Sequence, residues 1–209
     1  MRRTPVRTFP LLLALLAVAG IALAQRDAAI AGVIDSEIPL PDGVRVGVQL
    51  FGADQRPVEE IASTVPVGGT FTVEFGEVDE DRLLPFRSGA ELLPGLLNEY
   101  LVEPEGVRYV RGTLWMYVDA DADGTWTRSV SGAGEPYFLA FSQLERPPGF
   151  FSLLYVDREA RMTAAGVDLT LQPGWNLFTL RVGEDGVATY EIHDRIGDAA
   201  LDVIDLVGR

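Results

Sequence analysis

Residues 44–50 read Val44-Arg45-Val46-Gly47-Val48-Gln49-Leu50, with an aliphatic side chain at every second position. Successive side chains of a β-strand point to opposite faces of a sheet, so this period of two predicts a strand with one buried face. Residues 70–75 repeat the pattern, because phenylalanine and valine alternate there with threonine and glutamate. The two stretches together indicate a β protein.

Similar short apolar runs follow along the chain and are separated by turn residues. Further strands are expected at residues 29–34, 107–118, 125–130, 137–142, 150–156, 167–171, 175–182 and 187–193. Proline, glycine and aspartate stand between them, as at residues 39–43 and 184–186, where an Asp-Gly pair favours a tight hairpin. Many short strands with little helix between them predict an all-β fold, mainly an antiparallel β-sandwich.

Two segments depart from the strand pattern. Ser88 and Glu91 have the spacing of a helix capping box, so a short helical insertion is expected near residues 88–99, or alternatively an irregular leucine-rich loop. From residue 194 onward the apolar residues fall on a helical stripe, which predicts a C-terminal helix or a loosely held tail. We expect one β-sandwich domain over residues 25–209, or alternatively a small β meander at 25–76 beside a main sandwich at 107–193.

The composition excludes several classes of chemistry. The chain has neither cysteine nor lysine, and His193 is its single histidine. Disulfides, thiol nucleophiles, cysteine-ligated zinc and lysine Schiff bases are therefore ruled out. The 31 acidic residues outnumber the 17 basic ones and give a formal net charge of −14. Such a charge disfavours nucleic acid as a partner and attracts divalent cations.

Residues 1–24 have the features of an export signal. Three arginines, Arg2, Arg3 and Arg7, precede an apolar run that ends in the small-x-small sequence Ala22-Leu23-Ala24. This run is too short to cross a bilayer comfortably, which favours a cleaved signal peptide over a retained membrane anchor. The mature chain is expected to begin near Gln25, in the periplasm, the cell envelope or the extracellular space. An uncleaved leader would be its only link to a membrane.

One segment has the chemistry of a metal site: Asp119-Ala120-Asp121-Ala122-Asp123-Gly124-Thr125. Alternate carboxylates can direct their oxygens at one hard cation, glycine permits a sharp turn, and the next residue can offer its carbonyl. Calcium suits such a loop because it accepts about six to eight oxygen ligands with tolerant geometry. The segment resembles the first half of extracellular DxDxDG calcium loops, such as those of EF-hands and dockerins. This resemblance implies ligation by the side chains of Asp119, Asp121 and Asp123 and by the carbonyl of Thr125.

The match to a calcium loop is incomplete. Counted from Asp119, the acidic twelfth position of an EF-hand is Val130 in this chain, and the flanking residues are strand-like. A distant acid such as Glu135 or Asp157, or water, would have to complete the shell, which predicts weak affinity, on the order of 10⁻⁴ to 10⁻³ M. The alternative is an acidic hairpin tip in which aspartate and glycine serve turn formation alone.

Other residues give weaker signals of function. His193 beside Asp194 could orient a general base, but no Gly-x-Ser-x-Gly motif presents a serine to it, so we expect an ordinary residue at the end of a strand. Trp115 and Tyr117 share one face of their strand, which suggests either a ligand surface or core packing. Carboxylate pairs of a glycan hydrolase depend on a spatial separation that sequence does not show.

The beginning of the chain resembles a known class of module. Ala31-Gly32-Val33-Ile34, the strand at 44–51 and Gly69-Thr70-Phe71-Thr72-Val73, all within residues 28–76, look like the start of bacterial transthyretin-like or carboxypeptidase-regulatory-like β-sandwich modules. The resemblance implies a role in attachment or support. The sequence thus predicts an exported, non-enzymatic binding or envelope-assembly protein, stabilised by calcium, with an envelope protein or a glycan as partner. The alternative is a carboxylate-based, glycan-active hydrolase.

Overall fold

The computed structural model describes residues 28–36, 39–54, 56–86, 101–126, 140–144, 149–164, 167–183 and 188–203. Within these ranges there is no α-helix, and the only helical element is a 3₁₀ turn, η1 (Glu80–Arg82). The protein is therefore all-β in its described part, as predicted. The strands are β1 (Ala28–Ser36), β2 (Val44–Phe51), β3 (Pro57–Thr64), β4 (Thr70–Phe75), β5 (Leu84–Pro85), β6 (Leu101–Glu103), β7 (Arg108–Val118), β8 (Ala140–Leu144), β9 (Gly149–Val156), β10 (Ala160–Ala164), β11 (Val167–Leu171), β12 (Gly174–Val182), β13 (Ala188–His193) and β14 (Arg195–Val203).

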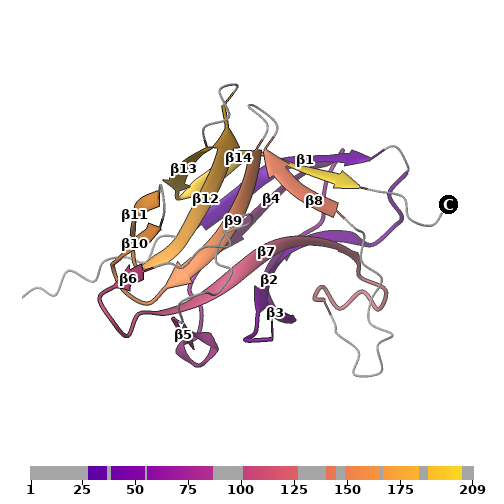
Figure 1. The fold of residues 1–209 in the computed structure, drawn as a ribbon. Coiled ribbons are helices and arrows are strands. Elements are labelled where there is room, and N and C mark those ends of the chain that lie inside the picture. The colour runs from indigo at the N-terminus through magenta and orange to yellow at the C-terminus, as the bar shows by residue number, and fades with distance from the viewer. Residues whose placement is uncertain are drawn as a thin grey trace, which may run out of the picture.

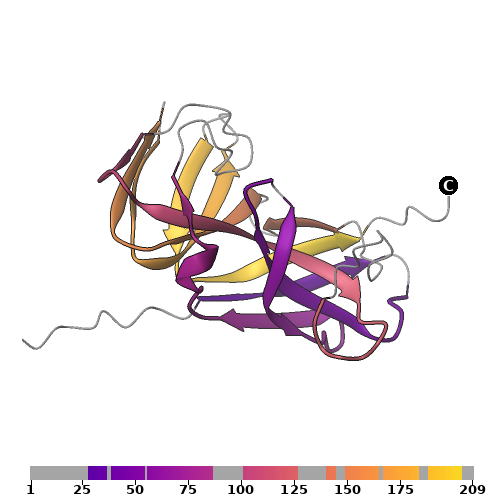
Figure 2. The same cartoon turned by 90° about the horizontal axis from the view of Figure 1, so that it is seen from below.

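Most of these strands belong to one large sheet (Figure 1). Its main path runs β3-β2-β7-β9-β8-β14-β1-β4, while β12 continues from β9 to β13, and β5 pairs with β7. The pairs are antiparallel, except that β1 and β14 run parallel. The strands β6, β10 and β11 form a second, three-stranded sheet that stands to one side of the first (Figures 1 and 2).

The main hydrophobic core lies inside the curl of the large sheet. The end strands β3 and β4 lie against each other, so the sheet turns back on itself. Alternate residues of β2 point into this core and are at most 5% exposed, namely Val44, Val46, Val48 and Leu50. Opposite them, Leu114 and Met116 of β7 are equally buried. The strand predicted at residues 44–50 is confirmed, with its aliphatic face inward.

A second hydrophobic core lies between the two sheets. Leu154 and Val156 of β9 face it together with Phe178 of β12, and Met162 and Leu171 come from the small sheet. The intervening residues of β9 belong to the main core instead. Strand β9 is consequently buried on both faces, which explains why its sequence is a continuous apolar run without alternation.

The C-terminal helix predicted from residue 194 is wrong, because residues 195–203 form β14 between β1 and β8. The pairs Ile30↔Ile196 and Gly32↔Ala199 show that β14 uses three residues where β1 uses two. This bulge places Ile196, Ala199 and then Leu201 on the side of the main core. The three-residue step from Ile196 to Ala199 matches helical spacing, and the burial of Ala199, Ala200 and Leu201 in succession leaves no alternation, so the apolar pattern resembled a helix.

The antiparallel meander predicted within residues 25–76 differs from the observed pairing. Strand β1 pairs with β4 and β14, whereas β2 pairs with β3 and β7, so both edges of each strand are occupied by other partners. The consecutive strands β1 and β2 are thus not neighbours in the sheet, whereas β2 and β3 are. The leader at 1–24 and the helical insertion predicted at 88–99 lie outside the described residues.

The parallel pairing of β1 with β14 can be tested at Gly32. A Cβ atom there would overlap the carbonyl oxygen of Ala199. We expect Gly32→Ala to lower the free energy of unfolding by about 1–3 kcal/mol, measured from urea transitions by tryptophan fluorescence. The matched control is Gly197→Ala, where a Cβ would meet nothing within 4 Å, so a change of about 0.5 kcal/mol or less is expected. Equal losses in both variants would contradict the register described here.

Candidate metal centre

The three aspartates lie in a loop that begins where β7 ends. The backbone nitrogen of Asp119 donates to the carbonyl of Gly43 at 2.9 Å, which ties the first residue of the loop to the start of β2. The next residues curl tightly, with φ of 59° at Ala122 and 86° at Gly124. Glycine adopts such a left-handed conformation without steric cost, which is the role predicted for Gly124. Residues 119–125 are called the aspartate loop below.

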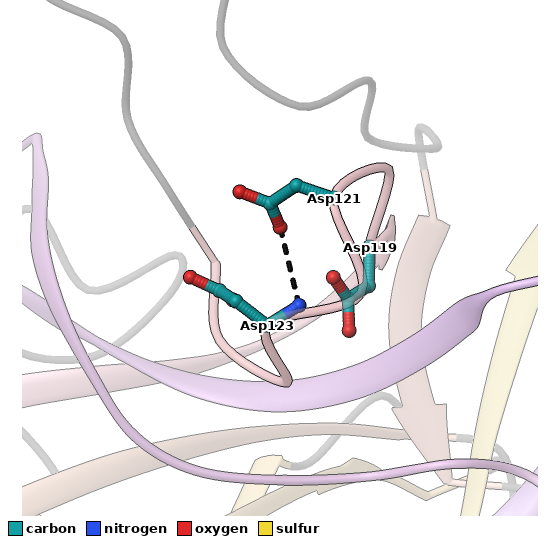
Figure 3. A group of neighbouring side chains, drawn as sticks. All are labelled: Asp119, Asp121 and Asp123. Carbon is teal, nitrogen blue, oxygen red and sulfur yellow. Dashed lines mark hydrogen bonds between the residues drawn. The ribbon is translucent and has the colours of Figure 1, made fainter.

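Hydrogen bonds within the aspartate loop hold each carboxylate in place, and Figure 3 shows the one between Asp121 and Asp123. Oδ2 of Asp119 accepts from the backbone nitrogen of Gly124 at 3.0 Å, and Oδ1 of Asp121 accepts from that of Asp123 at 3.3 Å. Oδ1 of Asp123 accepts from both the nitrogen and the hydroxyl of Thr125, at 2.7 and 2.9 Å. The bonds of Asp121 and Asp123 are Asx turns, which order a loop with or without an ion.

The loop brings the three predicted ligand side chains together. One oxygen each from Asp119, Asp121 and Asp123 lies within 4.8 Å of the other two. Calcium–oxygen bonds are about 2.3–2.6 Å long, so oxygens on opposite sides of one ion are about 5 Å apart. The spacing therefore fits a single shared cation. The carbonyl of Thr125 remains a predicted fourth ligand.

Asp119 is the member of the cluster whose carboxylate lacks a partner for one oxygen. Its side chain is only 7% exposed, yet Oδ1 is buried without a hydrogen-bond partner. Arg45 places its Nη1 3.9 Å from the other oxygen, Oδ2. A buried carboxylate oxygen without a donor costs several kcal/mol in principle, and a bound cation would remove that cost.

Asp157, suggested above as a completing ligand, lies too far away. Its carboxylate accepts from the backbone and side chain of Arg108, at 3.0 and 3.3 Å, and from Arg158 at 2.8 Å. Arg108 begins β7, whereas Asp119 follows the end of this 11-residue strand, so the two acids are separated by about 30 Å. Glu135, the other suggested acid, lies outside the described residues.

Two residues of β3, Ser63 and Glu60, hold the aspartate loop against the sheet, and neither was predicted from the sequence. Ser63 of β3 donates to the carbonyl of Gly124 at 3.3 Å and accepts from Arg45 at 2.9 and 3.1 Å. Glu60 of the same strand accepts from the backbone nitrogen of Trp126. Burial raises the pKa of the Glu60 carboxyl, and hydrogen bonds from its neighbours offset this only in part. Two register shifts against β2 remove the alternating pattern of β3, so its sequence did not indicate a strand.

The aromatic face predicted on β7 is covered. Tyr117 is fully buried, and the Trp115 ring packs edge-on against Trp126, with centroids 5.7 Å apart and an interplanar angle of 82°. Trp126 directly follows the aspartate loop, so the end of the loop covers part of Trp115. Tyr117 is thus packed in the interior, whereas Trp115 is half-buried and belongs to neither hydrophobic core.

His193 ends β13, as predicted, and makes two side-chain contacts. Its Nε2 lies 2.9 Å from Oγ1 of Thr179 and 3.4 Å from a carboxylate oxygen of Glu191. In a catalytic triad the acid binds the ring nitrogen opposite the nucleophile, whereas here both groups share one nitrogen. Thr179 is also only 2% exposed, which leaves its hydroxyl out of reach of a substrate. The contacts support a structural role for His193.

Comparisons of the chain with protein families, with curated proteins and with solved structures found no match. Among the described residues, no helix has the length and apolar character needed to span a membrane.

Asp157 provides a test that separates stability from metal binding. Burial by itself raises the pKa of Asp157, but hydrogen bonds from Arg158 and Arg108 outweigh it, and the pKa lies below its usual value. The resulting stabilisation is present above the unfolded pKa of about 4 and is lost as the pH falls below it. We expect Asp157→Asn to lower the free energy of unfolding by about 1–3 kcal/mol at pH 7 and by less at pH 3, measured by urea denaturation.

The matched control is Asp168→Asn, which breaks an ion pair with Arg161 in which both side chains are 59% exposed. Its effect should be much smaller because water screens this pair. Neither variant should change the response of the protein to calcium. A reduced calcium response in Asp157→Asn would contradict the separation of the two sites.

Proposed function

We propose that this protein is an exported, calcium-stabilised β-sandwich that serves as a non-enzymatic binding or assembly component of the periplasm or cell envelope. The observation on which the proposal rests is the buried, unpaired Oδ1 of Asp119 beside the carboxylates of Asp121 and Asp123. Three carboxylates so close together repel one another, and a divalent cation converts this repulsion into attraction.

The donor set favours calcium over other metals. Every ligand assigned to the site is an oxygen: three carboxylates and the carbonyl of Thr125. Zinc prefers nitrogen and sulfur ligands, and magnesium demands a near-octahedral shell and keeps most of its water. A partial shell of this kind binds calcium with dissociation constants of about 10⁻⁴ to 10⁻³ M, which suits an extracellular site. The export signal at residues 1–24 supports the same location.

A role in binding or assembly follows from the resemblance to support modules and from the arrangement of the chain's one histidine. His193 shares a single ring nitrogen between Thr179 and Glu191, which is not how a general base is oriented. Calcium would then act by stabilising the loop and the sheet beneath it, leaving the surface of the sandwich to contact an envelope protein or a glycan.

Calcium is expected to raise the melting temperature. At 10 mM calcium and the affinity given above, mass action stabilises the protein by about 1–3 kcal/mol relative to EDTA. For a domain of this size the shift is about 3–10 °C, measured by circular dichroism. Asp121→Ala should abolish it, while Asp35→Asn, a change at an exposed acid of β1, should leave it intact. An unchanged transition of the wild type in calcium would refute the metal site.

The binding role is tested by capture from envelope extracts. The tagged protein should retain a specific envelope protein or glycan in calcium and release it in EDTA, and Asp121→Ala should retain less. A parallel screen on polysaccharides tests the opposite outcome. Turnover of a polysaccharide that one carboxylate substitution abolishes would overturn the non-enzymatic function. The proposal of a calcium site would still stand.

A further inference from the structure

The aspartate loop has two arms: the end of β7, which leads into it, and Trp126, which follows it. Glu60 contacts both arms. Its Oε1 accepts from the hydroxyl of Tyr117 at 2.9 Å and from the backbone nitrogen of Trp126 at 3.3 Å. Tyr117 stands two residues before Asp119, and Trp126 directly follows Thr125. A single carboxylate oxygen therefore holds the chain as it enters the loop and as it leaves.

The other oxygen of Glu60 is fixed as well. Oε2 accepts from Nε2 of Gln49 at 2.7 Å, and Gln49 is fully buried. The carboxylate lies directly over Gly47, where an added Cβ would overlap Oε2. Glycine at position 47 is thus what leaves room for the acid. The position of Glu60 is determined by β2, β3 and β7 together.

Ser63 supplies a second attachment from the same strand. It links the carbonyl of Gly124, inside the loop, to the guanidinium of Arg45 on β2. Ser63 and Glu60 thus hold the loop against the sheet. Backbone groups of the loop itself hold the ligand side chains. Glu60 is not one of the three acids whose oxygens lie within 4.8 Å of one another, so we treat it as a support of the loop and not as a ligand.

We propose that Glu60 is a positioning residue that sets the calcium affinity of the aspartate loop by holding its two arms together. The inference rests on the proposed calcium site. Closing a loop that gathers three like charges costs conformational entropy and electrostatic energy, and a loop already held closed leaves less of this cost to the binding step. Loss of such an outer partner typically lowers metal affinity by about 10–100-fold.

The test compares calcium affinities of four proteins well below their melting temperatures. Isothermal titration with calcium chloride gives the affinity, and terbium luminescence sensitised by Trp126 gives an independent measure. We expect Glu60→Ala to weaken calcium binding by about 10–100-fold. Glu60→Gln should recover most of the affinity, because its amide oxygen can still accept from Tyr117 and Trp126. Glu59→Gln, at a neighbouring acid that pairs with Arg82 at 2.7 Å, should bind like the wild type.

The outcomes separate this inference from the calcium site itself. If the wild type binds no calcium, the proposed function fails; if Glu60→Ala binds as tightly as the wild type, only the role of Glu60 fails. Should Glu60→Ala not fold, Tyr117→Phe decides instead, since it removes the attachment of the entry arm alone. A loss of affinity in Tyr117→Phe, with unchanged near-ultraviolet circular dichroism in EDTA, would support the role, and an unchanged affinity would overturn it.

Discussion

The register between β2 and β7 determines two surfaces at once. Val46 pairs with Met116 on the face of the main core, whereas Arg45 pairs with Tyr117 on the opposite face, beneath the aspartate loop. Because side chains alternate along a strand, a slip of one residue would exchange the two faces and bury the arginine in the core. Hydrophobic burial on one side of the sheet therefore fixes the polar residues on the other, and the loop depends on the core for its position.

Electrostatics give this polar face its character. Glu60 is held by neutral donors, and Asp119 has one guanidinium at 3.9 Å, in a chain of net charge −14. Among the residues that the structure describes, Arg45 is the cation found beside these acids, and it balances their negative charge only in part. The remaining negative charge is concentrated in the loop, where the backbone brings three carboxylates close together. Such a concentration of negative charge raises the local concentration of a divalent cation.

The sequence allowed the strand content to be predicted wherever alternation is regular, as in β2 and β4. It misled at β14, where a bulge imitates helical spacing, and it was silent on β3, where two shifts of register conceal the alternation. The aspartate loop was visible because its residues are contiguous. Glu60 was not, since its partners Gln49, Tyr117 and Trp126 come from three other parts of the chain and only the pairing of the strands brings them together.

The parallel pairing of β1 with β14 also has a consequence for the order of folding. β14 connects β8 to β1, so the first strand and its partner β4 join the hydrogen-bonded path of the large sheet only through the last one. Contacts between such distant segments form slowly, and until they do the early strands offer open backbone edges to chaperones or to other chains. A nascent chain of this topology cannot complete its large sheet until β14 has been synthesised, although β1 and β4 are made first.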